Sequence, residues 1–340
     1  MTDYSDHNII EQAVYGYSRG HRELRSSVSL SSADTYELAA LTDLAPGARL
    51  SADESYLSGM LLPSGGHYAL VRTWLAQEMP RPGCVWSHVF LIPRQTLTTQ
   101  VDLSVFYPLF RRPHEYQTDE TFVGKIMVPM RGMTDSHRPA AAVDQLLSAV
   151  YLGGRPNHAA LSAEQWDRAV LAVWSQQWPA LRRRFVFRSV PTSAKLNGQA
   201  FEFRDGGLGK LETQPTWLGA ATEDAVSTKV TPLRRFLWRY GKDIASPAAA
   251  YQDLVRFYLK DGFVPPAELT VEVFKRFGQG QADTLKRDLL GLNPRPLALV
   301  QRVEKSDLAH LLSSCPEAMA TYYYSAAGGE PARMTTPSPR

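Results

Sequence analysis

Hydrophobic and polar positions in the first 130 residues follow a pattern typical of β-strands. Gln12–Tyr17 and Arg22–Leu30 flank a turn that contains a glycine, which predicts a β-hairpin. Within Tyr68–Leu75, the larger side chains Tyr68, Leu70, Arg72 and Trp74 alternate with Ala69, Val71 and Thr73, which predicts a strand. Cys84–Ile92 is a mostly apolar run that we expect in the centre of a sheet. A further strand is expected at Phe122–Pro129.

One helix is expected inside this strand-rich part, at Ser32–Asp43. Ser32 or Asp34 is positioned to cap its beginning, and Pro46-Gly47 ends it. The segment Arg131–Pro139, rich in Gly, Asp, Ser and Pro, follows the last strand. We therefore place the first domain boundary in that segment.

The middle of the chain begins with two helices. Apolar residues spaced i, i+3, i+4, i+7 and i+8 from Val143 form one helical face, which Gly153-Gly154 ends. Ser162 with Gln165 three residues later is a capping box that predicts a second helix. Two short strands are then expected, and they are Phe185–Val190 and Ala200–Arg204.

The remainder, about residues 216–325, is predicted to be helical throughout. Ser246-Pro247 begins the clearest helix and Gly262 follows its end. The other helices expected here are Ala267–Phe277, Ala282–Leu290 and Ser306–Ser314. From Ala326 the chain is small, polar and rich in proline, which indicates a disordered tail.

Together these patterns predict an α+β protein with a strand-rich N-terminal domain, a mixed α/β middle region and an all-helical C-terminal region. The expected divisions are residues 1–135, 136–215, 216–325 and a disordered tail at 326–340. Composition agrees with a globular protein, since 44% of the 340 residues are hydrophobic and 21% are charged.

Charge and cysteine content exclude several classes of protein. The formal net charge of +3 is too small to indicate a nucleic-acid or membrane partner for the whole chain. Cys84 and Cys315 are too few for a disulfide framework or a cysteine-based zinc finger. No signal peptide and no membrane-spanning run is recognised, so we expect a cytoplasmic protein.

No cofactor or metal is expected, because the motifs that would hold one are missing from the sequence. There is no G-x-G-x-x-G, and the eight histidines are scattered. The stretch Gly206–Lys210 is faintly similar to a P-loop. However, Arg204 stands where the first glycine should be and Leu211 replaces the hydroxyl residue, so the end of a hairpin is the favoured interpretation.

The densest unusual chemistry lies between Glu78 and His88. A Cys-His hydrolase needs its thiolate and imidazole within about 3–4 Å, whereas four strand residues separate Cys84 from His88 by about 13 Å. A dyad would therefore need His21 or His67 from another strand. The favoured alternative is a structural core, whose members are Cys84, Trp86, His88 and Trp74.

Basic residues gather at two other places. The segment Tyr15–Arg22 carries three basic groups and two glycines, which suits an anion or partner site, although a merely solvated turn is the favoured alternative. Arg182-Arg183-Arg184 could grip phosphate, but a solvated helix end is favoured. Residues 229–305 hold 14 basic and 8 acidic groups, a local charge of +6, without any nucleic-acid reader motif, so nucleic-acid binding is not expected.

Four stretches taken together resemble a known family. They are Val14–His21 with Leu24 and Ser26–Val28, Tyr68–Leu70 with Arg72–Trp74, Glu78–His88, and Phe110–Pro113. In this order they resemble the type-one N-terminal domain of the bacterial GTPase-associated protein family. More loosely, the stretch from Trp174 to Phe187 resembles the middle region of that family.

The resemblance implies a non-enzymatic adaptor or regulator in a GTPase-centred bacterial conflict system that acts in anti-phage defence. Its partners would be a GTPase or other proteins of the same gene cluster. The residues we expect to bind a partner are Tyr17, Arg19, Gly20, His21, Arg22 and Arg81. The alternative is a protease-like hydrolase that uses Cys84 with His21 or His67.

Overall fold

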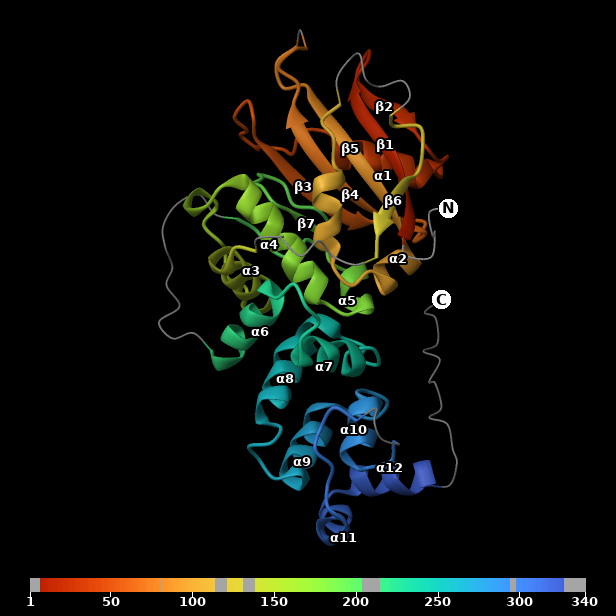
Figure 1. Cartoon of the computed structure of the whole chain (residues 1–340), viewed down its shortest axis with the longest axis vertical. Coiled ribbons are helices and arrows are strands. Elements are labelled where there is room, and N and C mark those ends of the chain that lie inside the picture. Colours follow the sequence, from red (N-terminus) through yellow and green to blue (C-terminus); the bar gives the residue numbers. More distant parts are fainter. Residues whose placement is uncertain are drawn as a thin grey trace. The chain divides into compact units, whose positions relative to one another are not determined.

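A computed structural model describes residues 7–79, 81–113, 121–130, 138–203, 215–293 and 298–326. As predicted, the fold is α+β, with a strand-rich N-terminal part followed by helices (Figure 1). The chain forms two compact units, one that ends at Thr231 and one that begins at Pro232. The stretch similar to a P-loop and residues 327–340 of the predicted disordered tail lie outside the described residues. Ala326, where that tail is predicted to begin, is the last residue of a helix.

The first unit is built on an antiparallel sheet in the order β2-β1-β5-β4-β3-β7, with β6 also paired to β1. The central position of β5 confirms the prediction made from its apolar sequence. The strands are β1 (His7–Tyr17), β2 (His21–Ser26), β3 (Ser55–Leu61), β4 (His67–Leu75), β5 (Val85–Pro93), β6 (Ile126–Pro129) and β7 (Phe187–Arg188).

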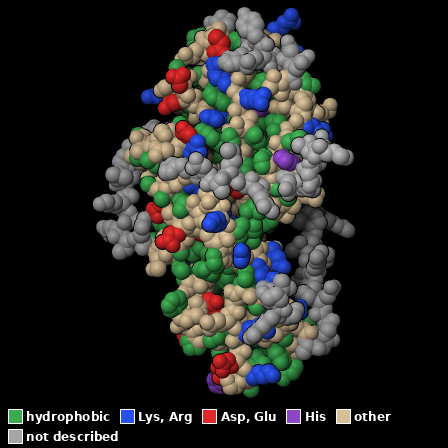
Figure 2. All heavy atoms as spheres, viewed as in Figure 1, with side chains coloured by type: hydrophobic (Ala, Val, Ile, Leu, Met, Phe, Trp, Pro, Cys, Tyr) green, Lys and Arg blue, Asp and Glu red, His purple; other side chains and the backbone are tan. Residues whose placement is uncertain are grey.

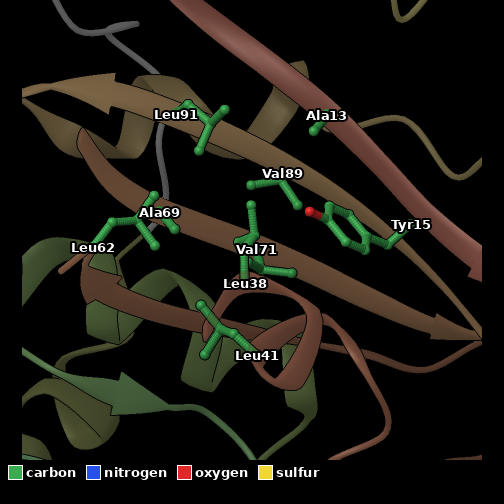
Figure 3. Packing of buried hydrophobic residues seen from close by; sticks show 9 residues of the cluster. All are labelled: Ala13, Tyr15, Leu38, Leu41, Leu62, Ala69, Val71, Val89 and Leu91. Atoms are coloured by element: carbon green, nitrogen blue, oxygen red, sulfur yellow. The ribbon is translucent and has the colours of Figure 1, made fainter. Parts of the chain in front are cut away.

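Helix α1 (Ser32–Thr42) covers one face of this sheet. Leu38 and Leu41 of the helix pack against Val71 of β4 and Val89 of β5, and Tyr15 of β1 completes the cluster (Figure 3). All of these side chains are buried, so the helix is stabilised by the apolar area it removes from water.

The N-cap of α1 differs from the two residues predicted. Ser31 is the cap, and its hydroxyl accepts a hydrogen bond from the backbone N–H of Asp34. The Asp34 carboxylate instead accepts from the N–H of Ser64, across the start of β4. A buried carboxylate therefore links α1 to the β3–β4 turn rather than capping its own helix.

The opposite face of the sheet is covered by α4, which carries Trp174 against Tyr68 of β4 at 4.5 Å between ring centroids. The capping box of Ser162 and Gln165 and the left-handed Gly153 after α3 are both present as predicted. The helices of this unit are α2 (Arg94–Thr99), η2 (Leu103–Leu109), α3 (Ala140–Leu152), η3 (His158–Ala160), α4 (Ala163–Gln176), α5 (Pro179–Arg183) and α6 (Thr216–Val226).

Two strand predictions in the middle region are wrong in extent. Of the first, only Phe187–Arg188 pairs in the sheet, with Gly59 and Ser58 of β3. The second, Ala200–Phe203 in its described part, forms no strand, and a single bridge joins Val186 to Gln199. The sequence analysis also missed β3 itself.

Arg182 corrects the interpretation of the arginine run as a solvated helix end. Its side chain is only 1% exposed, and its guanidinium donates hydrogen bonds to backbone carbonyls at the ends of α2 and α4. The acceptors are the carbonyls of Leu97 (2.9 Å), Gln100 (2.6 Å), Val101 (3.3 Å) and Ser175 (2.5 Å). The last carbonyls of a helix lack partners within it, so one arginine satisfies groups that burial would otherwise penalise.

The second unit is all-helical, as predicted. Its core joins α9, α11 and α12 around Phe274, Leu311 and Ala318. Asp288, fully buried, accepts hydrogen bonds from Arg239 and Tyr240 and so ties α10 to α7. The helices are α7 (Pro232–Tyr240), α8 (Pro247–Lys260), α9 (Pro266–Arg276), α10 (Asp283–Leu289), α11 (Lys305–Ser314) and α12 (Pro316–Ala326).

We predict that Arg182→Ala lowers the free energy of unfolding by roughly 3 kcal/mol or more, because it strips partners from four backbone carbonyls at once. Urea denaturation of the variant and of the wild type measures the difference. Arg183→Ala, which removes the partly exposed neighbour, is the control, with an expected loss below about 0.5 kcal/mol. Equal losses for the two variants would contradict the role assigned to Arg182.

Candidate functional site

The β1–β2 turn and the segment that joins β4 to β5 lie at the same end of the sheet (Figure 1). The register requires this, because Tyr15 pairs with Ser87 near the start of β5, and Leu75 pairs with Val85. We call this region the sheet end and define it as Ser18–Arg22 together with residues 76–79 and 81–84. It contains most of the residues that the sequence marked as partner-binding candidates.

Trp86 anchors the sheet end. It is 2% exposed, and its indole N–H donates to the Glu78 carboxylate at 2.7 Å. The other oxygen of Glu78 pairs with Arg112 at 2.8 Å, and the same guanidinium donates to the Leu75 carbonyl. Partial burial disfavours the charge on Glu78, but the hydrogen bonds from Arg112 and Trp86 outweigh it and lower the pKa of this carboxyl.

Trp86 of β5 leaves no room for a side chain at Gly16 of β1. A Cβ atom added at Gly16 would lie 2.4 Å from Cζ3 of the indole, closer than any real contact. The ring therefore packs directly on the backbone of β1, and only glycine allows it. This contact explains one of the two glycines that flank the turn.

The turn presents its arginines to solvent. Arg19 adopts φ +58° and Gly20 φ +123°, so the reversal is made in the left-handed region of backbone space. Arg19, Arg22 and Arg81 are all exposed, Tyr17 is half-buried, and Arg22 donates to the Ser18 hydroxyl at 3.2 Å. Figure 2 shows basic side chains over this upper end of the molecule, with acidic side chains beside them.

His21 points inward, unlike its arginine neighbours. Its Nε2 lies 3.0 Å from the Thr42 hydroxyl at the end of α1, and its ring stacks with Tyr15 at 6.0 Å between centroids. Burial lowers the pKa of His21, and Asp43, 4.0 Å from Nδ1, opposes that shift. The imidazole thus connects the β1–β2 hairpin to the end of α1.

His88 is buried at the centre of a hydrogen-bond network. Its Nδ1 accepts from the backbone N–H of Arg111 at 3.1 Å, so Nε2 carries the proton and donates to Gln12 Oε1 at 2.9 Å. The Gln12 amide in turn donates to the carbonyls of Thr121 and Gly124. Burial, reinforced by the nearby charge of Arg111, lowers the pKa of His88 to about 3, so the ring is neutral.

Cys84 lies in the sheet end together with His21, whereas the strand register carries His67 to the other end of the sheet. Cys84 is half-buried, and among the described residues its thiol makes no hydrogen bond. His67 pairs with Pro93, eight positions along β5 from Val85, which places it about 26 Å from the start of that strand.

A buried polar cluster on the α4 face was missed by the sequence analysis. Asp167 of α4 accepts hydrogen bonds from the Leu57 N–H at 3.2 Å and the Ser189 hydroxyl at 2.5 Å, and burial raises its pKa to about 7. Nearby, Arg72 lies over the rings of Trp74 and Tyr107. Asp167 thereby joins α4 to β3 and to Ser189, which follows β7. An aspartate inside an apolar helix was the available signal.

Neither metal ligation nor a membrane span is found in the described residues. No cluster of three or more His, Cys, Asp or Glu side chains in them could hold an ion. None of their helices combines the length and the apolar character needed to cross a bilayer.

Comparison with known families supports the family resemblance over the N-terminal part of the chain. Residues 9–110, which run from β1 to the end of η2, match the family model described as GTPase-associated protein 1, N-terminal domain type 1. This segment is therefore similar to the GTPase-associated protein 1 N-terminal domain. The matched segment includes the whole sheet end, so Arg19, Arg22 and Arg81 all lie within it. No curated protein and no solved structure matches the chain. The resemblance of the middle region remains a prediction.

We predict that His88 makes the protein sensitive to mild acid. A histidine in the unfolded chain has a pKa near 6.5, whereas folded His88 has a pKa of about 3. Between these two pH values the unfolded chain therefore binds a proton at this position that the folded protein does not bind. Its contribution to stability is complete above about pH 6.5 and is lost towards pH 3, by up to about 1.4 kcal/mol per pH unit. Urea unfolding at about pH 7 and about pH 5 should show a shallower fall for His88→Gln than for the wild type. Equal falls would contradict the buried neutral ring.

Proposed function

We propose that this protein is a non-enzymatic adaptor or regulatory component of a GTPase-centred bacterial conflict system that acts in anti-phage defence. It works in the cytoplasm by binding a partner GTPase or another protein of the same gene cluster. The GTPase-associated domain at residues 9–110 supports the link to a GTPase. The sheet end of that domain is the proposed contact surface.

One observation carries this choice of surface. Arg19 lies in the β1–β2 turn, Arg22 at the start of β2 and Arg81 between β4 and β5, yet the strand register brings them to one end of the sheet with exposed side chains. Arginine forks bind carboxylates in two-point geometry, so this end suits an acidic partner surface. The Trp86–Glu78–Arg112 contacts beneath it hold the two connections on a rigid base.

The same geometry gives the hydrolase alternative no support. Cys84 lies within the sheet end, but the register places His67 far along the strands, and His21 is engaged with Thr42. A substitution of Cys84 thus separates the two functions. Cys84→Ala should leave partner binding unchanged if the protein is an adaptor, and should abolish activity if it is a cysteine hydrolase.

The partner is found by purifying the tagged protein from its native host and identifying what is retained by mass spectrometry. A GTPase encoded beside its gene and retained in stoichiometric amount supports the adaptor. Recovery of the protein alone, or with nucleic acid that salt removes, would contradict it.

We predict that Arg19→Ala and Arg81→Ala each weaken binding of the retained GTPase about two- to fivefold, the usual effect of removing one exposed charge pair. Titration of the purified partner measures the change. Arg94→Ala is the matched control, because Arg94 is an exposed arginine that follows the other end of β5. Unchanged affinity in both test variants, with wild-type thermal unfolding, would exclude this surface.

A further inference from the structure

Arg19 adopts a backbone conformation that arginine rarely takes. Its φ of +58° lies in the left-handed region, where the Cβ atom of an L-residue crowds the following carbonyl oxygen. Among the described residues one other non-glycine residue, Ala282, has a positive φ, and it is fully buried at the start of α10, where packing holds it. Arg19 is exposed, and glycine would adopt the same conformation without the cost. Outliers of this kind concentrate at functional sites, which indicates that the Arg19 side chain has a role.

The Arg19 guanidinium has no hydrogen-bond or ion-pair partner within the part of the chain that the structure describes. Its neighbour Arg22 differs, because it donates to the Ser18 hydroxyl at 3.2 Å. Glu78 of the same sheet end is already paired with Arg112 at 2.8 Å. Arg19 therefore presents its N–H donors to a ligand outside these residues.

The tip that carries Arg19 is narrow. Ser18 precedes it and Gly20 follows it, and a Cβ atom added at Gly20 would have nothing within 4 Å. The Ser18 N–H donates to the Gly20 carbonyl at 2.9 Å, and Tyr17 pairs with His21 where the strands begin. Arg19 is thus the one long side chain between Ser18 and Gly20, on a tip with room around it.

Both strands that lead to this tip are fixed close to the turn. On β2, the His21 Nε2 lies 3.0 Å from the Thr42 hydroxyl at the end of α1. On β1, the backbone at Gly16 packs against the Trp86 indole. An arginine on a fixed turn loses little backbone freedom when it enters a partner's cleft, so ordering opposes its action less.

A GTPase partner offers a ligand that suits such an arginine. The planar guanidinium matches two oxygens of a phosphate and remains protonated at any pH at which proteins fold. During GTP hydrolysis, negative charge develops on the transferred phosphoryl group and the leaving oxygen, and an arginine supplied by a second protein stabilises it. An exposed carboxylate on the partner would gain little free energy from Arg19, so it does not account for an arginine held in a costly conformation.

We propose that Arg19 is a catalytic arginine supplied in trans, which enters the nucleotide site of the partner GTPase and accelerates hydrolysis of GTP. This inference rests on the proposed function and gives the regulator a chemical action. The oxygen of a water molecule forms a bond to the γ-phosphorus, and the bond from that phosphorus to the β–γ bridging oxygen breaks. The bridging oxygen leaves on GDP with the electron pair, the attacking water gives up a proton to the phosphate or to solvent, and the guanidinium stays protonated throughout.

The test measures phosphate release from GTP and Mg²⁺ by the GTPase that copurifies with the full chain. Each variant is added at about ten times its own Kd or more, so that differences in binding do not enter. The wild type should raise the single-turnover rate constant by about a thousandfold, and Arg19→Ala should lose at least about 100-fold of that acceleration. Arg19→Lys should not restore it, because an ammonium group lacks the planar fork.

Two further variants separate catalysis from folding and from binding. Arg19→Gly should unfold at a temperature no lower than Arg19→Ala, since glycine adopts φ +58° freely, and should still fail to accelerate hydrolysis. Arg81→Ala is the matched control, because it removes another exposed arginine of the sheet end. At saturating concentration it should accelerate hydrolysis as the wild type does.

A transition-state analogue gives a second readout that a merely structural role would not change. GDP with aluminium fluoride and Mg²⁺ resembles the phosphoryl group in transfer. The wild type should bind the GTPase loaded with this analogue at least about tenfold more tightly than the GTPase loaded with GDP alone. Arg19→Gly should show no such preference, and Arg81→Ala should keep it.

The failure of this inference can be told from the failure of the proposed function. No acceleration by the wild type, full acceleration by Arg19→Gly, or a loss that Arg81→Ala shares at saturation would each overturn the role of Arg19. If the GTPase is still retained and binds through the sheet end in those cases, the adaptor stands without a catalytic arginine. If no GTPase is retained, both proposals are wrong.

Discussion

The sheet end depends on the packing of Trp86 directly against the backbone at Gly16. The indole lies where a Cβ atom would be, so β1 and β5 approach each other in only one register, with Tyr15 opposite Ser87. The indole N–H holds Glu78, and Glu78 holds Arg112, so the same ring also fixes the segment that joins β4 to β5. The exposed arginines are thus presented by connections whose bases are rigid.

Much of the fold could be predicted because burial follows periodicity. The alternation in Tyr68–Leu75, the apolar run of β5 and the capping box at Ser162 each became the expected element. Strand β3 could not be found in this way, since Ser58 and Gly59 are buried between two covered faces and no alternation marks them. Gly59 is small because Tyr68 and Phe187 occupy the space of its side chain.

Charge in a sequence predicts neither exposure nor direction. Arg182 sits in a run of three arginines and resembles a solvated helix end, yet it is buried because four backbone carbonyls at helix ends need donors. His21 belongs to the basic turn and faces inward, whereas Arg19 beside it faces out. The candidate residues could therefore be named from the sequence, but their grouping required the register.

The account depends on the claim that the sheet end contacts the partner. Amide hydrogen exchange of the full chain, alone and in the complex purified with its GTPase, tests that claim most directly. We expect slower exchange on binding in residues 17–26 and in residues 76–84, with little change in the helices of the second unit. Protection confined to the helices from Pro232 onward, with unchanged exchange at the sheet end, would contradict the account.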